Sequence, residues 1–227
     1  MIVSGKNVFN ELKTNKKNIK KAYLSKNFHD AKIIKFIKEN HIQYESVDEA
    51  RMKALDSANH QGVILIINEY EYFDAMDFLD EDMVVILDHL EDPHNFGAII
   101  RTCESAGIRS IIIPKDRSVG VNPTVVKTSS GAIEYVKIAI ASNLVQIINK
   151  FKSHGFFVYG TDALGKDYNE IDYSNKVLLV IGSEGKGISR LVKESCDEII
   201  SIPMKGNINS LNASVAAGII IYKIIGK

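Results

Sequence analysis

The sequence lacks tryptophan altogether and has only two cysteines and four prolines among its 227 residues. Cys103 and Cys196 form no CxxC pair, so the sequence predicts neither a disulfide framework nor a cysteine-based zinc site. No run of about 18 apolar residues is present that could span a membrane. Residues 1–6 are too few and too polar for a signal peptide. We therefore expect a soluble protein that stays in the cytoplasm.

The net charge is zero, but the 28 basic and 28 acidic residues are unevenly distributed along the sequence. Residues 1–68 carry a net charge of +5, residues 69–82 carry −7 with no Lys or Arg, and residues 83–227 carry +2. The length fits one large domain or two small ones. We expect two units, 1–68 and 83–227, with an acidic linker over 69–82. The basic front unit suits either a polyanion such as nucleic acid or ordinary solvated helix faces.

The front unit is predicted to be a compact α/β fold. Apolar spacing predicts helices that alternate with short strands. The expected elements are helices over 5–12, 31–39 and 48–55, and strands over 20–25, 42–47 and 62–67.

From Met83 onward, apolar strands alternate with amphipathic helices. Strands that are apolar on both faces predict a parallel sheet covered on both sides, and ligands bind such sheets at the carboxyl ends of the strands. The expected strands are 84–87, 110–113, 156–161, 177–181 and 198–202, and the expected helices are 96–106, 144–153, 189–196 and 214–225.

The loop after the strand over 84–87 contains polar residues beyond what folding needs. Asn95 is placed to cap the following helix. Arg101, on a different stripe from the apolar residues of that helix, suits either a surface ion pair or a phosphate grip. His89 and His94 stand among carboxylates, but their spacing matches no metal-ligand pattern, so we expect no metal.

The loop after the strand over 177–181 reads Gly-Ser-Glu-Gly-Lys-Gly from Gly182 to Gly187. It is not a P-loop, because Ile188 stands where the lysine is required, and Glu184 would repel a phosphate. The loop is either a tight turn or a site for a ligand that presents hydroxyl or ammonium donors.

The third loop, residues 202–212, leads into the last helix, which Asn212 or Ser214 could cap. That helix has an unusual stripe of small residues, which predicts close backbone packing: Ala213, Ala216, Ala217 and Gly218.

Together these loops resemble the three motifs of the SpoU (TrmH-type) branch of the SPOUT RNA 2′-O-methyltransferases. The matching strings are HNFGAIIRTCESAGI, LVIGSEGKGIS and ISIPMKGNINSLNASVAAGIIIY, and the segment Lys127–Ala132 also fits. Gly5-Lys6-Asn7-Val8 and His60-Gln61-Gly62-Val63 resemble the substrate-binding domain of RlmB-type 23S rRNA guanosine methyltransferases, although this match is looser.

The resemblance implies a homodimer whose C-terminal domain is a parallel-sheet SPOUT fold with a deep trefoil knot. The front domain would be a small ribosomal-protein-like α/β unit that binds the substrate RNA. S-adenosylmethionine would lie in the knot, held mostly by main-chain groups at Gly182, Ile202 and Leu211.

The implied reaction is methyl transfer to a ribose 2′-hydroxyl. On the family pattern Arg101 lies at the reacting centre, where Asn95, Glu184, Ser210 and Asn212 order it and the ribose. Because guanidinium stays protonated, our hypothesis is that Arg101 holds the neighbouring phosphate and orients the hydroxyl.

The implied partner is 23S rRNA or a ribosome assembly intermediate, with no role for membrane or DNA. Two alternatives remain: 2′-O-methylation of tRNA or of an rRNA adenosine, and a non-catalytic rRNA-binding assembly factor. Phe28, Tyr23 and Tyr44 could stack on bases or pack in the core.

Overall fold

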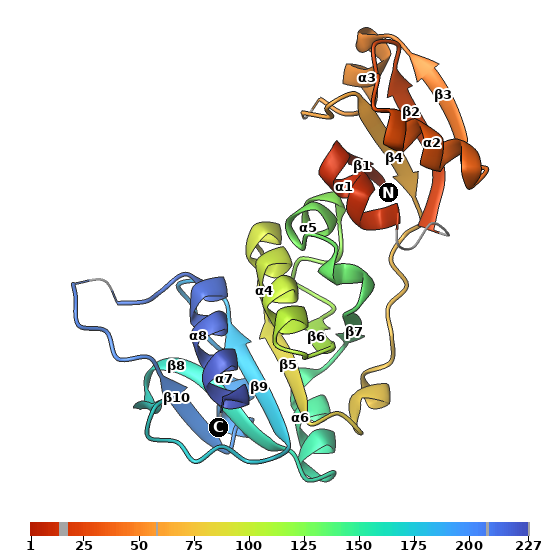
Figure 1. Cartoon of the computed structure of the whole chain (residues 1–227). Helices are drawn as coiled ribbons and strands as arrows, with labels where there is room; N and C mark the ends of the chain where they lie inside the picture. The colour runs from red at the N-terminus through yellow and green to blue at the C-terminus, as the bar shows by residue number, and fades with distance from the viewer. Residues whose placement is uncertain (14–17, 58, 208, 227) are drawn as a thin grey trace.

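The computed structural model describes residues 1–13, 18–57, 59–207 and 209–226. Ile208 of the third loop, Lys227 at the end of the second expected unit, and residues 14–17 and 58 of the first lie outside the described residues. Two separate β-sheets organise the chain, and Figure 1 shows them at opposite ends of the molecule.

The first sheet has four strands in the order β1-β4-β2-β3. β4 is antiparallel to both β1 and β2, whereas β2 and β3 are parallel. Apolar residues of α1 and α2 form the core on one face, and Met52 of α3 packs with Tyr23 on the other. The elements are β1 (Ile2–Ser4), α1 (Lys6–Leu12), β2 (Ile19–Ser25), α2 (Ala31–Glu39), β3 (Gln43–Val47), α3 (Glu49–Leu55) and β4 (Val63–Ile67).

The second sheet has six parallel strands in the order β10-β8-β9-β5-β6-β7. The strands are β5 (Met83–Asp88), β6 (Ser110–Pro114), β7 (Lys137–Ala141), β8 (Phe157–Asp167), β9 (Val177–Gly182) and β10 (Glu198–Ser201). The helices are η2 (Ala75–Phe78), α4 (Pro93–Ser105), α5 (Pro123–Thr128), η3 (Ala132–Glu134), α6 (Leu144–Lys152), α7 (Arg190–Ser195) and α8 (Ala213–Ile225).

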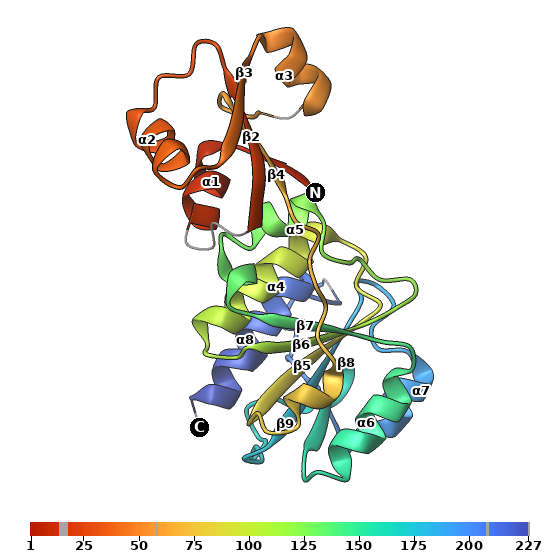
Figure 2. The same cartoon turned by 90° about the vertical axis from the view of Figure 1, so that its right-hand side faces the viewer.

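Both faces of this sheet are buried, as its strand sequences predict. Val85 and Leu87 of β5 join the core beneath α4 and α8, whereas Val84 and Ile86 join the core beneath η2, α6 and α7. Figure 2 shows these helix layers on opposite sides of the strands. The expected parallel α/β fold is confirmed.

Two expectations about this sheet are wrong. The expected strands do not include β7, whose residues Lys-Ile-Ala-Ile-Ala form only a short apolar run, so the sheet has six strands instead of five. The first helix of this unit is expected to start at Phe96, whereas α4 begins at Pro93. Proline suits the first helical position because its missing N–H has no partner there in any helix.

The acidic segment between the sheets contacts the second unit through two tyrosines. The Tyr70 hydroxyl donates to the Val136 carbonyl (3.0 Å) and accepts from the Ile138 N–H (3.0 Å). The Tyr72 hydroxyl accepts from the Val121 N–H at 2.9 Å. Burial raises the pKa of Tyr70 to about 12, so its phenol remains a donor. The division of the chain into two domains and a linker at 69–82 stays a prediction.

The two units also touch through α5 and η3. Val126 of α5 is buried in the core of the front unit, and Asn18 donates from its amide to the Glu134 carboxylate at 3.1 Å. Within the described residues, no helix is both long and apolar enough to cross a membrane.

Candidate functional site

The three loops singled out in the sequence all follow strands of the parallel sheet. β5 leads into the loop over 89–92, β9 into the loop over 183–189, and β10 into the loop over 202–212. Because parallel strands end at one edge of a sheet, the three loops lie at the same edge. α4 and α8 begin at this edge and pack side by side (Figures 1 and 2).

Three of the expected site residues form one hydrogen-bonded cluster. The Asn95 amide Nδ2 donates to Glu184 Oε1 at 2.5 Å, and Asn212 Nδ2 donates to Asn95 Oδ1 at 2.9 Å and to Glu184 Oε1 at 3.0 Å. Asn95 is 5% exposed, so its amide is buried with both polar atoms bonded. Buried polar groups need such partners, and the bonds fix the orientation of both amides.

Asn212 also caps α8, which confirms one of the two roles considered for it. Its Oδ1 accepts from the backbone N–H groups of Ser214 (3.0 Å) and Val215 (3.3 Å), and from the Ser214 hydroxyl (2.6 Å). The side-chain oxygen thus holds the helix start while the side-chain nitrogen holds the cluster.

The capping role expected for Asn95 is wrong. Asp92 is the N-cap of α4, and its carboxylate accepts from the N–H groups of His94 (3.1 Å) and Asn95 (3.2 Å). The Asp-Pro pair over 92–93 carries this signal, since Asp favours the N-cap and Pro the next position. Because Asp92 caps the helix, the Asn95 side chain can instead bind Glu184 and Asn212.

The expected cofactor-binding residues line one cavity of about 370 Å³. Gly182, Ile202 and Leu211 all contribute to it, as do Glu184 and Ser210. A Cβ on Gly182 would lie 2.2 Å from the Gly187 carbonyl carbon, so only glycine fits there. This volume is within the usual range for small-molecule sites.

The lining of this cavity suits a cationic organic ligand. Apolar Ile181, Ala213 and Ile220 form part of it, Asp162 and Glu184 contribute carboxylates, and Lys186 contributes an ammonium group. Lys193, 2.9 Å from Asp162, lowers the pKa of that carboxyl, and the Leu164 N–H adds to the effect. Asp162 is therefore already paired with a cation. Glu184 makes no ion pair within the described residues, so its carboxylate can face a positively charged group, such as a sulfonium or ammonium.

Arg101 is not part of the hydrogen-bonded cluster in a single chain. It is exposed on α4, and among the described residues its guanidinium makes no hydrogen bond or ion pair. Burial raises the pKa of Glu11 in α1, and the Arg101 charge partly opposes this rise. Arg101 therefore belongs to the surface of α4 that faces the front unit, with its donors available to a ligand.

Contacts with the segment Lys127–Ala132 require a glycine at position 97 of the first motif. A Cβ on Gly97 would lie 1.8 Å from Thr128 Oγ1 and 3.0 Å from the Ser129 backbone nitrogen. The Thr128 side chain is held within its own helix by a hydrogen bond, in which its hydroxyl donates to the Thr124 carbonyl at 2.8 Å. These two motifs are thus in direct contact, and α5 fixes the position of α4.

Two front-unit motifs also meet. The Lys6 N–H donates to Gln61 Oε1 at 2.9 Å, and the Gly5 N–H donates to the Val63 carbonyl at 3.0 Å. They border a wide surface hollow that also includes Phe28 and Lys53.

A further group at the sheet edge, around Asp88, has no role among the sequence-based expectations. This carboxylate is fully buried, contacts His89 Nδ1 at 2.5 Å and accepts from the Ser189 N–H at 2.6 Å. Asp88 thereby ties the first loop to the second. No group of three or more His, Cys, Asp and Glu side chains is placed to hold a metal in the described part of the chain.

Comparisons with known proteins agree with this geometry. Residues 82–222 match the SpoU rRNA Methylase family, and residues 2–73 match the RNA 2′-O ribose methyltransferase substrate binding family. A TrmH family tRNA/rRNA methyltransferase of Staphylococcus saprophyticus is 44% identical over 203 residues, which cover 86% of this chain and 82% of that protein. YacO of Bacillus subtilis, named in the same way, is 39% identical over 99% of this chain and 95% of its own.

Solved structures show the same fold over both units. An AdoMet-bound rRNA methyltransferase from Sinorhizobium meliloti has a TM-score of 0.80 and 26% identity, and covers 98% of this chain and 85% of its own. The SpoU methyltransferase AviRb from Streptomyces viridochromogenes, in complex with AdoMet, has a TM-score of 0.82 and 22% identity over 100% of this chain and 89% of its own. The chain belongs to the SpoU rRNA methylase family, whose methylase and substrate-binding parts it carries in one polypeptide.

Proposed function

We propose that this chain transfers a methyl group from S-adenosylmethionine to the ribose 2′-hydroxyl of a guanosine in 23S rRNA, as RlmB-type enzymes do. The observation that carries the proposal is the double position of Glu184. It lines the cavity expected to hold the cofactor, and it is bonded to Asn95 and Asn212. A methyl donor in the cavity and an acceptor beside the cluster would thus be neighbours.

Gly182, Ile202 and Leu211 would hold the cofactor through main-chain groups, with the apolar lining beside them. When bound, the cofactor supplies an electrophilic methyl group on a sulfonium. The carboxylate of Glu184 complements that positive charge, whereas Asp162 is paired with Lys193. The AdoMet in the Sinorhizobium meliloti and AviRb structures supports this assignment.

The cluster has an unused acceptor for the ribose. Glu184 Oε1 accepts from both asparagine amides, whereas Oε2 makes no hydrogen bond within the described residues. Oε2 can therefore accept from the 2′-hydroxyl and orient it, since positioning of a weak nucleophile is a large part of catalysis. Ser210, on the same cavity, supplies a further hydroxyl.

Arg101 would hold the phosphate beside the target ribose. Its guanidinium makes no hydrogen bond or ion pair within the described residues, and it offers a planar pair of donors that fits a phosphate. The role requires the RNA to lie along the exposed face of α4, next to the front unit.

The front unit would select the RNA. Tyr23 and Phe28 are buried, so they serve packing, whereas Tyr44 on β3 is 43% exposed and open to stacking. The hollow that includes Lys53 offers a cationic group to a polyanion, and Lys6 on the same hollow is paired with Asp30 at 3.4 Å. Both cysteines are free, which suits a reducing cytoplasm.

A homodimer with a knotted C-terminal chain completes the proposal. α8 has an exposed apolar stripe that includes Val215, Tyr222 and Ile225. An apolar stripe of this kind marks an interaction surface. The knot is proposed from the resemblance of the loops to the family motifs.

Transfer of a tritiated methyl group from S-adenosylmethionine tests the proposal. The acceptors are unmodified 23S rRNA and bulk unmodified tRNA, and Arg101→Ala is assayed in parallel. We expect label in 23S rRNA, at a guanosine ribose, and a large loss with the variant.

Label in tRNA alone, or at an rRNA adenosine, would contradict the substrate assignment and keep the chemistry. Cofactor binding without label in any RNA, including pre-ribosomal particles, would point to the non-catalytic alternative. If Arg101→Lys kept nearly full activity, bidentate phosphate binding could not be the role of Arg101.

A further inference from the structure

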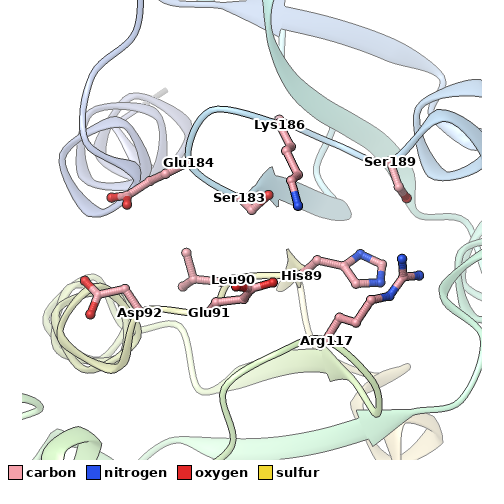
Figure 3. Close-up of a pocket in the computed structure, with 10 residues that line it drawn as sticks. His89, Leu90, Glu91, Asp92, Arg117, Ser183, Glu184, Lys186 and Ser189 are labelled. Carbon is pink, nitrogen blue, oxygen red and sulfur yellow. The ribbon is translucent and has the colours of Figure 1, made fainter.

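A second hollow at the carboxyl edge of the sheet adjoins the cluster and is unexplained by cofactor binding. It lies between the loop after β5 and the loop after β9, and has a volume of about 360 Å³. Figure 3 shows Glu184 and Asp92 at one end of it and His89 and Arg117 at the other. Because Glu184 also lines the cofactor cavity, this hollow leads away from the expected reacting centre.

The hollow continues past Arg117 into another of about 440 Å³. The two share His89, Arg117 and Ser189, and the second adds Lys115 and Arg190. Together they form a groove along the sheet edge that runs from the cluster toward α7.

The far end of the groove is rich in unpaired positive charge. Lys115 and Arg117 are exposed and make no ion pair within the described residues. Lys186, which lines both the first hollow and the cofactor cavity, is likewise exposed and without an ion pair among the described residues. Arg190 is paired only with Glu194 of its own helix, at 2.9 Å, among the residues that the structure describes. The carboxylates of the first hollow are Glu91, Asp92 and Glu184, and Asp116 lines the second.

The cationic end is built on a fixed backbone. The Leu90 carbonyl accepts from the Val119 N–H (2.8 Å) and from the Ser118 hydroxyl (3.2 Å), which ties the loop after β6 to the loop after β5.

Two residues that face the groove also have unusual backbone angles. His89 has φ 57° and Arg117 has φ 52°, in the left-handed region that is unfavourable for a non-glycine residue. Strained residues of this kind concentrate at functional sites.

We propose that this groove binds the RNA strand next to the target nucleotide, with Lys115 and Arg117 contacting its backbone phosphates. The inference rests on the proposed function and extends it. The target ribose lies at the Glu184 end, and the flanking phosphodiesters follow the groove past Lys186 and His89 to the cationic end. Contacts to phosphates set the register of the strand and are insensitive to base identity.

The test compares two double variants of the full chain that remove the same charge. Lys115→Gln with Arg117→Gln removes the cationic end of the groove. Arg109→Gln with Lys150→Gln removes two exposed cations at the opposite edge of the sheet, before β6 and at the end of α6. Both variants must bind S-adenosylmethionine with wild-type affinity by calorimetry, which establishes that the site is folded.

The measurements are KM and kcat with an unmodified 23S rRNA transcript, and the Kd for that RNA at several salt concentrations. For the groove variant we expect a rise in KM of about tenfold and a change in kcat below about twofold. The slope of log K against log salt becomes shallower by about 1.4, since each lost phosphate contact in single-stranded RNA removes about 0.7. The opposite-edge variant stays close to wild type.

Equal losses in both variants would show that only the overall charge matters, and would overturn the proposal. Unchanged KM and salt slope in the groove variant would overturn it as well, while wild-type methylation of the RNA left the proposed function standing. If the wild type methylated no RNA, the proposed function would fail, and the Kd comparison would still decide whether the groove binds RNA.

Discussion

Asn95 and Asn212 are 117 residues apart, and their side-chain amides are joined at 2.9 Å. Each lies at the start of a helix, α4 or α8, and the two helices pack together. A Cβ on Gly218 of α8 would lie 3.9 Å from Thr102 Cγ2 of α4. The two helices thus lie in ordinary van der Waals contact at Gly218, and Asn95 and Asn212 near their starts both bind Glu184. Packing of apolar and small residues is what places the polar cluster.

The two roles of Asn212 can be separated by substitution. Asn212→Asp keeps an oxygen for the Ser214 and Val215 N–H groups, but loses the donor to Asn95 and brings a second carboxylate beside Glu184. Asn212→Ala loses the cap as well. We expect both variants to lose at least about tenfold in kcat for RNA methylation.

Their stabilities should differ in urea unfolding. The alanine variant should lose about 1 kcal/mol through the missing cap, and the aspartate variant should lose less. Equal activity of Asn212→Asp and wild type would show that the bond to Glu184 has no part in the reaction.

Gly182 offers a test of the cofactor cavity. In Gly182→Ala the new methyl group would meet the backbone of Gly187 and Ile188 at 2.2 and 2.4 Å, so the loop must move. We expect a loss of stability of about 1–3 kcal/mol and a fall of at least about tenfold in S-adenosylmethionine affinity by calorimetry.

Gly206→Ala is the matched control, because its Cβ would meet nothing within 4 Å. A Gly182→Ala protein that bound the cofactor as tightly as the control would remove this loop from the cofactor site.

Much of the fold follows from the sequence because burial on both faces leaves a plain apolar signal in β5, β6 and β9. β7 is not found from the sequence because exposed Lys137 and Ile140 interrupt its buried residues, which is the pattern of an edge strand. The sequence predicts less of the site than of the fold. Glu184, Asn95 and Asn212 are found through their motifs, and the Asp-Pro pair over 92–93 contains a signal for the cap at Asp92 that our sequence analysis missed. The contact of Asp88 with His89 and Ser189 depends on backbone geometry. Arg117 has no motif at all, and only the fold brings it next to His89.

The exposed face of α8 predicts the oligomeric state. Val215 and Tyr222 are 50% and 52% exposed, one helical heptad apart. Tyr222→Asp places a charge in the middle of a stripe that a second copy would cover, so we expect a monomer in sedimentation experiments where the wild type is a dimer.

Leu164→Asp is the control, since Leu164 is 90% exposed and belongs to β8 instead of the stripe on α8. A Tyr222→Asp protein that sedimented like the control would contradict the assignment of this face.

The cysteines provide a pH-dependent test of the fold. Burial raises the pKa of Cys103 to about 12, and burial likewise raises the pKa of Cys196 to about 12. At pH 8 only about one thiol in ten thousand is then ionised, and the thiolate is the reactive form. We expect native protein to react slowly with a disulfide reagent at pH 8, and both thiols to react rapidly after unfolding.

The variant Cys196→Ser separates the two thiols, because Cys103, on the buried face of α4, is then the remaining cysteine. Its folded pKa lies above the ordinary value, so reactivity between pH 7 and 9 should be limited by opening of the structure and follow the free energy of unfolding. Rapid labelling of Cys103 in the folded protein, at a rate matching a free thiol of ordinary pKa, would show that α4 is not packed as described. The same result would then put in doubt the position of Asn95, since that residue begins the same helix.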